Sequence, residues 1–258
     1  MLSLDQIEKQ YPESLRQFKR GILREYLQYE ILGIIFGSKF ADKLSFLGGT
    51  ALRLIFDSQR FSEDLDFDNF GISEPEFEEL AQKIKSGLEL RGMEAQIDIS
   101  IKGAYRCNVR FPGLLFSQGL SSYQDEKILI QIDTAPHNYS YLPFKKVINK
   151  FDVFSEVFVT PPDILLSQKI FAALNRKRAK GRDFYDIVFL LSFAKPDYGY
   201  LKAKAGINDL AGLRDKLIGD LRELDFNELA RDVEPFLFNP GDSKKVKLFL
   251  PYIESLEL

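Results

Sequence analysis

Three aspartates alternate along a short stretch of the chain, and their spacing predicts a site for cations. Asp64, Asp66 and Asp68 are separated by Leu65 and Phe67. Alternate residues of an extended strand point to the same side, so the three carboxylates would share one face. Like charges held this close repel one another, and a divalent metal is the usual means of neutralising them. The pattern therefore predicts a metal-binding strand.

A glycine-rich motif upstream predicts a place for phosphate. Gly48, Gly49 and Thr50 follow an apolar run and precede a helix-like segment over residues 51–57, for which Thr50 is the expected N-cap. Glycines leave backbone N–H groups accessible, and a helix N-terminus favours anions. Two glycines in a strand-to-helix turn need no ligand, so the motif gains its weight from the acidic strand. Together they indicate chemistry on a nucleoside triphosphate. Arg60 and Ser62 are two further candidates for contact with phosphate. A local turn-capping role is an equal alternative for both.

Phosphoryl transfer with two metal ions uses about three carboxylates, and the sequence identifies the third of them less clearly than the first two. We expect Asp64 and Asp66 to bind metal together with Asp133, which ends a strand-like run whose alternate isoleucines face the other way. A turn-starting or capping role is the alternative for Asp133, and Asp68 is its rival as third ligand. A charged, solvent-facing strand edge is the alternative explanation for the whole acidic run.

A basic segment over residues 168–186 supplies the remaining candidates. Lys169 lies among apolar residues of a helix-like stretch, where a lysine can reach a triphosphate as a mobile point charge. Asp183 and Asp186 share a helix face; Asp183 would orient Lys169 or an arginine, or favour the helix N-terminus. The candidates for holding RNA phosphates, with an exposed charged loop as the alternative, are Arg176, Arg178 and Arg182.

Composition limits the class of protein. The chain has 258 residues, of which 45% are hydrophobic and 28% charged, as in soluble globular proteins. We expect no signal peptide, no membrane partner and, with Cys107 as the single cysteine, a cytoplasmic location. A net charge of −3 argues against general coating of nucleic acid. Because His137 is the single histidine, the metal would be a hard, oxygen-bound ion, Mg²⁺ or Mn²⁺.

The expected elements change character near residue 160, from an α/β half to a helical half. We therefore expect a domain over residues 1–160 and a helical domain over residues 161–258. The expected strands cover residues 43–47, 65–68, 95–101, 105–111, 127–133 and 153–159. The expected helices cover residues 4–36, 51–57, 75–90, 162–175, 182–193, 208–217, 226–237 and 243–255.

The combination of motifs resembles a known family. The pattern G-G-T-A-L-R-L…R-F-S-E-D-L-D-F, followed by Q-K…R-x-K-G-R-D-x-Y-D, is similar to that of AbiEii/MenT-type nucleotidyltransferase toxins, members of the polymerase-β-like nucleotidyltransferase superfamily. The resemblance covers residues 45–70 and 160–192. It implies an α+β fold: a nucleotidyltransferase domain with a mixed sheet flanked by helices, then a helical C-terminal domain that completes the active-site cleft.

The resemblance also implies roles for individual residues. The family's glycine-plus-hydroxyl motif falls on Gly48-Gly49-Thr50, with threonine where the wider superfamily has serine. Its paired aspartates fall on Asp64 and Asp66, its essential lysine on Lys169 and its later aspartate on Asp183. Such enzymes transfer a nucleotide from an NTP, in some members to the 3′ end of tRNA, and a cognate antitoxin restrains them. Abortive-infection systems and toxin–antitoxin pairs share these motifs.

Three hypotheses follow. The leading one is an Mg²⁺-dependent toxin that transfers a nucleotide to RNA, in which Asp133 completes the metal site or acts as a base. The second keeps the chemistry but uses a protein or small-molecule acceptor, which the net charge of −3 mildly favours. The third is a non-catalytic NTP-binding scaffold. The complete set of acidic residues and Lys169 count against this third hypothesis.

Overall fold

The chain folds into two compact units, described here for residues 1–136 and 139–256 of a computed structural model. Unit 1 comprises Met1–Asp57 and Phe61–Val159. Unit 2 comprises Thr160–Leu258 together with the short segment Ser58–Arg60. The chain thus leaves unit 1 between a helix and the acidic strand, contributes a few residues to unit 2, and returns.

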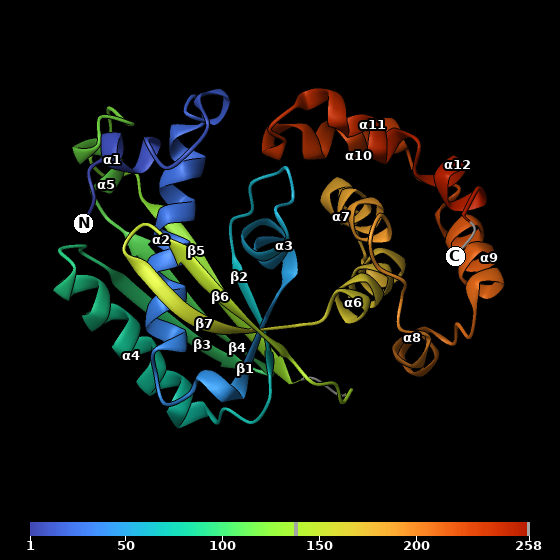
Figure 1. The fold of residues 1–258 in the computed structure, drawn as a ribbon, viewed down its shortest axis with the longest axis horizontal. Coiled ribbons are helices and arrows are strands. Elements are labelled where there is room, and N and C mark those ends of the chain that lie inside the picture. Colours follow the sequence, from blue (N-terminus) through green and yellow to red (C-terminus); the bar gives the residue numbers. More distant parts are fainter. Residues whose placement is uncertain (137–138, 257–258) are drawn as a thin grey trace. The chain divides into compact units, whose positions relative to one another are not determined.

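Within the described residues, a seven-stranded mixed sheet forms the centre of unit 1, with the strand order β3-β4-β5-β2-β1-β7-β6 (Figure 1). The pairs β2–β5 and β1–β7 are parallel, and the other neighbouring pairs are antiparallel. The expectation of a mixed sheet in an α+β fold is confirmed. The strands are β1 (Leu44–Leu47), β2 (Leu65–Asn69), β3 (Gln96–Lys102), β4 (Ala104–Phe111), β5 (Ile128–Pro136), β6 (Phe144–Lys150) and β7 (Val153–Val159).

Apolar side chains at alternating positions fix the faces of this sheet. Ile128, Ile130 and Ile132 of β5 are all buried, as their period of two predicts. The long helix α2 contacts β7 and α4, whereas α3 contacts β1 and β2. The α-helices of this unit are α1 (Leu4–Glu8), α2 (Lys19–Phe36), α3 (Gly48–Phe56), α4 (Glu74–Leu90) and α5 (Leu114–Ser117).

Unit 2 is helical, and aromatic rings form part of its core. The rings of Phe184, Phe226 and Phe249 pack with centroids 4.9–5.7 Å apart. None of the helices in residues 1–136 and 139–256 is both long and apolar enough to cross a membrane. The α-helices are α6 (Pro162–Asn175), α7 (Gly181–Leu191), α8 (Tyr198–Ala205), α9 (Leu210–Leu221), α10 (Phe226–Val233), α11 (Lys244–Lys247) and α12 (Phe249–Glu254). Short 3₁₀ turns cover Glu13–Leu15, Ala41–Lys43, Glu234–Phe236 and Pro240–Ser243.

Several expected elements were wrong in extent. The helix over residues 4–36 is interrupted, because Pro12 lacks a backbone N–H and the chain turns there into a 3₁₀ segment. The expected helix over residues 243–255 divides at Leu248 into α11 and α12. Thr50 is not an N-cap, since α3 already begins at Gly48. The sequence prediction also missed β6 and α8.

Candidate active site

The pairing of residues between neighbouring strands places three charged residues of the site in one row across the sheet. Asp66 of β2 is the parallel partner of Asp133 on β5, and Asp133 is the antiparallel partner of Arg106 on β4. Side chains of directly paired residues on neighbouring strands point to the same face. Two aspartates predicted as metal ligands are therefore neighbours, although they are distant in sequence.

The first turn of α3 lies directly against Asp66. Gly48 adopts φ +78°, and a Cβ atom at this position would lie 2.2 Å from Asp66 Oδ2. A side chain at Gly48 would therefore both strain the backbone and collide with the carboxylate. This close approach also places the Asp66 carboxylate at the N-terminal end of a helix, which favours negative charge. The two motifs that the sequence suggested thus meet at Gly48 and Asp66.

Side chains from two helices hold the backbone that leads into β2. The Thr50 hydroxyl donates a hydrogen bond to the Asp64 carbonyl oxygen. Gln28 of α2, only 1% exposed, donates its amide to the carbonyl oxygens of Ser62 and Glu63, each at 3.0 Å. Thr50 and Gly49 are buried, and Ser62 is partly exposed. The sequence prediction missed Gln28. Its amide side chain among the apolar residues of this helix was the signal that could have identified it.

Asp133 is engaged by two side chains that sequence reasoning also missed. Arg106 Nε donates to Asp133 Oδ1 at 2.7 Å, and Gln131 Nε2 donates to Oδ2 at 2.6 Å. Side-chain exposure is 26% for Asp133 and 50% for Arg106. The hydrogen bond and charge of Asp133, with a smaller contribution from Asp64, raise the pKa of the Arg106 guanidinium. The polar alternation of Arg106, Asn108 and Arg110 along β4 was the signal that marked this face.

Asp68 has a different environment from the other aspartates of the run. It is buried, and the Tyr141 hydroxyl donates to its Oδ2 at 2.5 Å. Tyr141 in turn packs edge-on against Phe70, with ring centroids 5.1 Å apart. Protein groups therefore supply Asp68 with a hydrogen-bond donor, and the row in the sheet contains Asp133 rather than Asp68.

The chemistry of the acidic row suits a hard divalent cation. Asp66 and Asp133 offer carboxylate oxygens from adjacent strands, the ligand type that Mg²⁺ and Mn²⁺ prefer. Across residues 1–136 and 139–256, however, no three histidine, cysteine or acidic side chains gather closely enough to form a metal-binding group. The structure thus presents a pair of candidate ligands with Asp64 nearby in the chain, and His137 lies outside the described residues.

Unit 2 contains its own charged cluster. Arg60 donates from Nε and Nη2 to the two carboxylate oxygens of Asp186 at 2.7 and 2.6 Å. Lys169 Nζ lies 2.8 Å from Asp186 Oδ2 and 3.1 Å from Asp183 Oδ1, and Arg176 Nε lies 2.9 Å from Asp183 Oδ2. Arg60, a candidate phosphate contact, is 1% exposed and directed at Asp186. Arg60, Lys169 and Arg176 thus contact the carboxylates of Asp183 and Asp186.

Opposite charges keep this cluster ionised despite burial. Burial raises the pKa of Asp186, but Arg60 and Lys169 outweigh burial and hold that pKa below its usual range. Burial likewise lowers the pKa of Lys169, yet the two aspartates raise it overall. The Lys169 side chain is 14% exposed. It therefore retains a positive charge and some access to solvent, which is what binding of an anion requires.

The arginines predicted to bind RNA differ in their surroundings. Arg176 and Arg178 are exposed in the connection between α6 and α7. Arg182, on the first turn of α7, is partly exposed, and its guanidinium carbon lies 5.8 Å from the centre of the Phe236 ring. Arg176 contacts Asp183, as described above. The loop thus presents Arg178 to solvent, while the other two guanidinium groups pack against neighbours.

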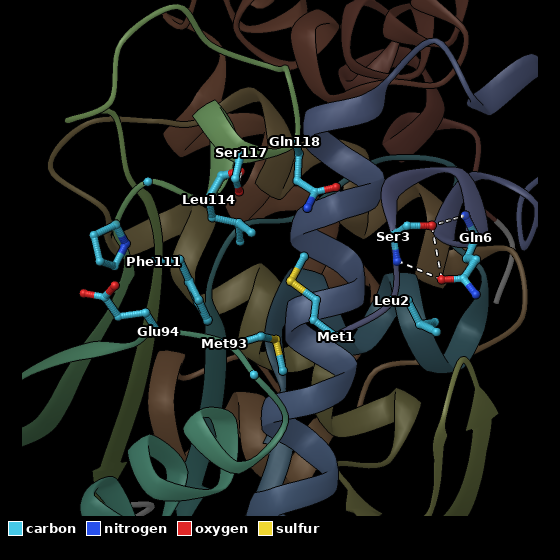
Figure 2. A pocket seen from close by; sticks show the side chains of 13 residues that line it. Met1, Leu2, Ser3, Gln6, Met93, Glu94, Phe111, Leu114, Ser117 and Gln118 are labelled. Carbon is cyan, nitrogen blue, oxygen red and sulfur yellow. Dashed lines mark hydrogen bonds between the residues drawn. The ribbon is translucent and has the colours of Figure 1, made fainter.

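A surface pocket of about 630 Å³ lies elsewhere on unit 1 (Figure 2). Met1, Met93, Phe111 and Gln118 are among the residues that line it. In Figure 2 these side chains gather around the N-terminal residues, where Ser3 and Gln6 hydrogen-bond to one another. None of the predicted site residues lines this pocket.

Comparison with solved structures identifies the fold. The chain is similar to MenT4, a nucleotidyltransferase toxin from Mycobacterium tuberculosis H37Rv, with 16% identity over 100% of this chain and 91% of that chain and a TM-score of 0.60. It is also similar to a putative nucleotidyltransferase from H. pylori (17% identity, 93% and 98% covered, TM-score 0.53). JHP933 from Helicobacter pylori gives 18% identity, 91% of each chain covered and a TM-score of 0.51. The fold is that of a nucleotidyltransferase.

The sequence identifies the family. Residues 31–247 match the family described as nucleotidyl transferase AbiEii toxin, type IV toxin–antitoxin system. The chain belongs to this family and is a nucleotidyltransferase, which confirms the resemblance seen in its motifs. Family membership implies an NTP substrate and an antitoxin partner. No curated protein sequence matched the chain.

Proposed function

We propose that this nucleotidyltransferase uses Mg²⁺, or Mn²⁺, to transfer a nucleotide from an NTP to RNA, with the 3′ end of tRNA as the acceptor. The observation that carries the proposal is the pairing of Asp66 with Asp133 on neighbouring strands, with Gly48 packed against Asp66. A cytoplasmic location accords with the single buried cysteine, Cys107.

The acidic residues of unit 1 would bind metal and handle the acceptor proton. Asp64 and Asp66 would hold the metal, and Asp133 would complete the site or act as a base. Bound divalent cations neutralise phosphate charge and promote attack by a hydroxyl. In the reaction, the acceptor hydroxyl oxygen bonds to the α-phosphorus, its proton passes to a carboxylate, and the bond to pyrophosphate breaks. The Thr50 hydroxyl and Gln28 would act indirectly, by fixing the backbone of residues 62–64.

Other candidates would bind phosphate groups. The first turn of α3, with Gly48 and Gly49, would offer backbone N–H groups. In unit 2, Lys169 would bind phosphate and Asp183 would orient it, which the 3.1 Å contact between them supports. Ser62 remains a candidate phosphate contact, whereas Arg60 would act through Asp186. Arg176, Arg178 and Arg182 would hold the phosphates of the RNA backbone.

The test is a labelling assay with the purified protein. Total cellular RNA is incubated with Mg²⁺ and each of the four α-³²P-labelled NTPs, using wild-type protein, Asp66→Asn and the control Asp98→Asn. Asp98 lies on the edge strand β3 of the same sheet, opposite Asn108. We expect a labelled band of tRNA size for wild type and Asp98→Asn, and none for a correctly folded Asp66→Asn. Full labelling by Asp66→Asn would contradict the proposed site.

A protein or small-molecule acceptor is the second candidate, because the net charge of −3 does not favour binding of RNA. Treatment of a cell extract with RNase before labelling separates the two. Loss of the labelled product indicates an RNA acceptor, and persistence of the product indicates another acceptor. Binding of NTP and metal without any release of pyrophosphate would instead point to a non-catalytic scaffold.

A further inference from the structure

A positive charge lies within the acidic row of unit 1. Arg106, Asp133 and Asp66 are successive partners on β4, β5 and β2, so their side chains share a face. An arginine beside two candidate metal ligands opposes a metal electrostatically, because like charges repel. The positive charge of Arg106 therefore affects how tightly this site binds a cation.

The contacts show which part of Asp133 the arginine holds. Arg106 Nε lies 2.7 Å from Oδ1, and its Nη2 lies 3.5 Å from Oδ2. The neutral amide of Gln131 donates to Oδ2 at 2.6 Å. Both carboxylate oxygens thus have protein donors. A divalent cation that takes Asp133 as a ligand can tolerate the amide on the second oxygen, but it repels the guanidinium on the first.

We propose that Arg106 is an internal counter-cation that competes with the divalent metal for Asp133 and so raises the metal concentration needed to load the site. The inference rests on the proposed function, since it takes Asp133 to be a metal ligand. The arginine neutralises the acidic face before metal binds, and the metal takes over this role on binding.

Exposure makes the exchange feasible. The Arg106 side chain is 50% exposed, so its guanidinium can turn into solvent without losing buried packing. Ion pairs as exposed as this one are weak, and their loss corresponds to a change in equilibrium constant of up to about fivefold. Arg106 therefore tunes metal binding over this range and does not block it.

The inference is tested by titrating the full chain with Mn²⁺ alone and measuring the Kd for Mn²⁺ by calorimetry. The variant is Arg106→Gln, and the matched control is Arg110→Gln. Arg110 lies on the same strand and the same face, but its partners on the neighbouring strands are Gln96 and Leu129. The substitution Arg110→Gln therefore removes the same charge without freeing an aspartate. We expect Arg106→Gln to bind Mn²⁺ more tightly than Arg110→Gln, by a factor of up to about five. Equal or weaker binding would overturn the role of Arg106.

Further variants separate this inference from the proposed function. The double variant Asp64→Asn, Asp66→Asn should lose Mn²⁺ binding; if it binds as wild type does, or if no variant binds Mn²⁺, the proposed metal site is wrong. If binding depends on these aspartates but is equal in the two arginine variants, the role of Arg106 alone fails. Arg106→Lys keeps the charge and should give an intermediate Kd, so it tests the same competition should Arg106→Gln fold poorly.

Discussion

At the scale of single residues, Gly48 is the most constrained position of the site. Gly48→Ala combines a positive φ, which costs an alanine about 1–2 kcal/mol, with a collision against Asp66 Oδ2. We expect the free energy of unfolding to fall by at least this amount. We also expect nucleotide transfer and Mn²⁺ binding to be lost, because Asp66 must move. Urea unfolding, the labelling assay and calorimetry measure the three quantities.

Gly119→Ala is the matched control for this prediction. Gly119 has φ +68°, close to that of Gly48, but no heavy atom within 4 Å would meet an added Cβ. It should therefore show a similar loss of stability with unchanged transfer activity. If Gly48→Ala also keeps full activity, the contact with Asp66 is not important for the reaction.

The sequence indicated those site residues that lie close together in the chain. Gly48 and Asp66 belong to one helix-and-strand segment, so their spacing was enough to predict that the glycine-rich turn lies near the acidic strand. Arg106 and Gln131 join Asp133 through the pairing of β4 with β5, and no local pattern specifies which residues of two strands become partners. The sequence suggested that Asp133 would take part without revealing the arginine that holds it.

At the scale of elements, α6 and α7 are joined by ion pairs that should make stability depend on pH. Asp186 has a lowered pKa, so its contribution is present above its unfolded pKa of about 4 and is lost as pH falls further. Lys169 has a raised pKa, so its contribution is present below about pH 10.4 and is lost above it. We expect urea unfolding to give a plateau of stability between these limits.

The variant Asp186→Asn identifies the residue responsible. At pH 7 it should be less stable by about 3–5 kcal/mol, because Arg60 then lacks its buried counter-charge and Lys169 retains only Asp183. Its stability should also fall less than that of wild type below pH 4. The surface variant Asp98→Asn should retain the wild-type pH profile. If the stability of Asp186→Asn falls below pH 4 as steeply as that of wild type, other carboxylates are responsible for the pH dependence.

Elements with a clear apolar period were predicted, and those without one were not. Strand β5 shows alternating isoleucines, and its position was predicted to within a few residues. Strand β6 was missed because it is an edge strand with Ile148 buried and Lys145 and Lys146 exposed, so it lacks a continuous apolar face. The limits of helices failed where proline or a local change of backbone angle interrupts an otherwise helical pattern, as at Pro12 and Leu248.

At the scale of the whole molecule, the division into units predicts how a fragment behaves. A fragment of residues 160–258 lacks Arg60, which belongs to the same unit. Asp186, with no exposed surface, would then be left with Lys169 alone. We expect this fragment to be far less stable than the same unit within the full chain, as followed by circular dichroism in urea.

Asp186→Asn within the fragment tests the cause. Removing the charge of a buried carboxylate that has lost Arg60 should raise the stability of the fragment, although the same change lowers that of the full chain. If the fragment unfolds at the same urea concentration with and without this change, loss of Arg60 does not explain its instability.

The excursion of Ser58–Arg60 also limits how these units can be exchanged by recombination. Domains joined by a single peptide link can be cut out and transplanted as one block of DNA. Here the chain passes between the units after Asp57, after Arg60 and after Val159, so one crossover at residue 160 would leave the arginine behind. A working chimera needs two separate stretches of coding sequence from the same parent, and the two units are therefore expected to be inherited together.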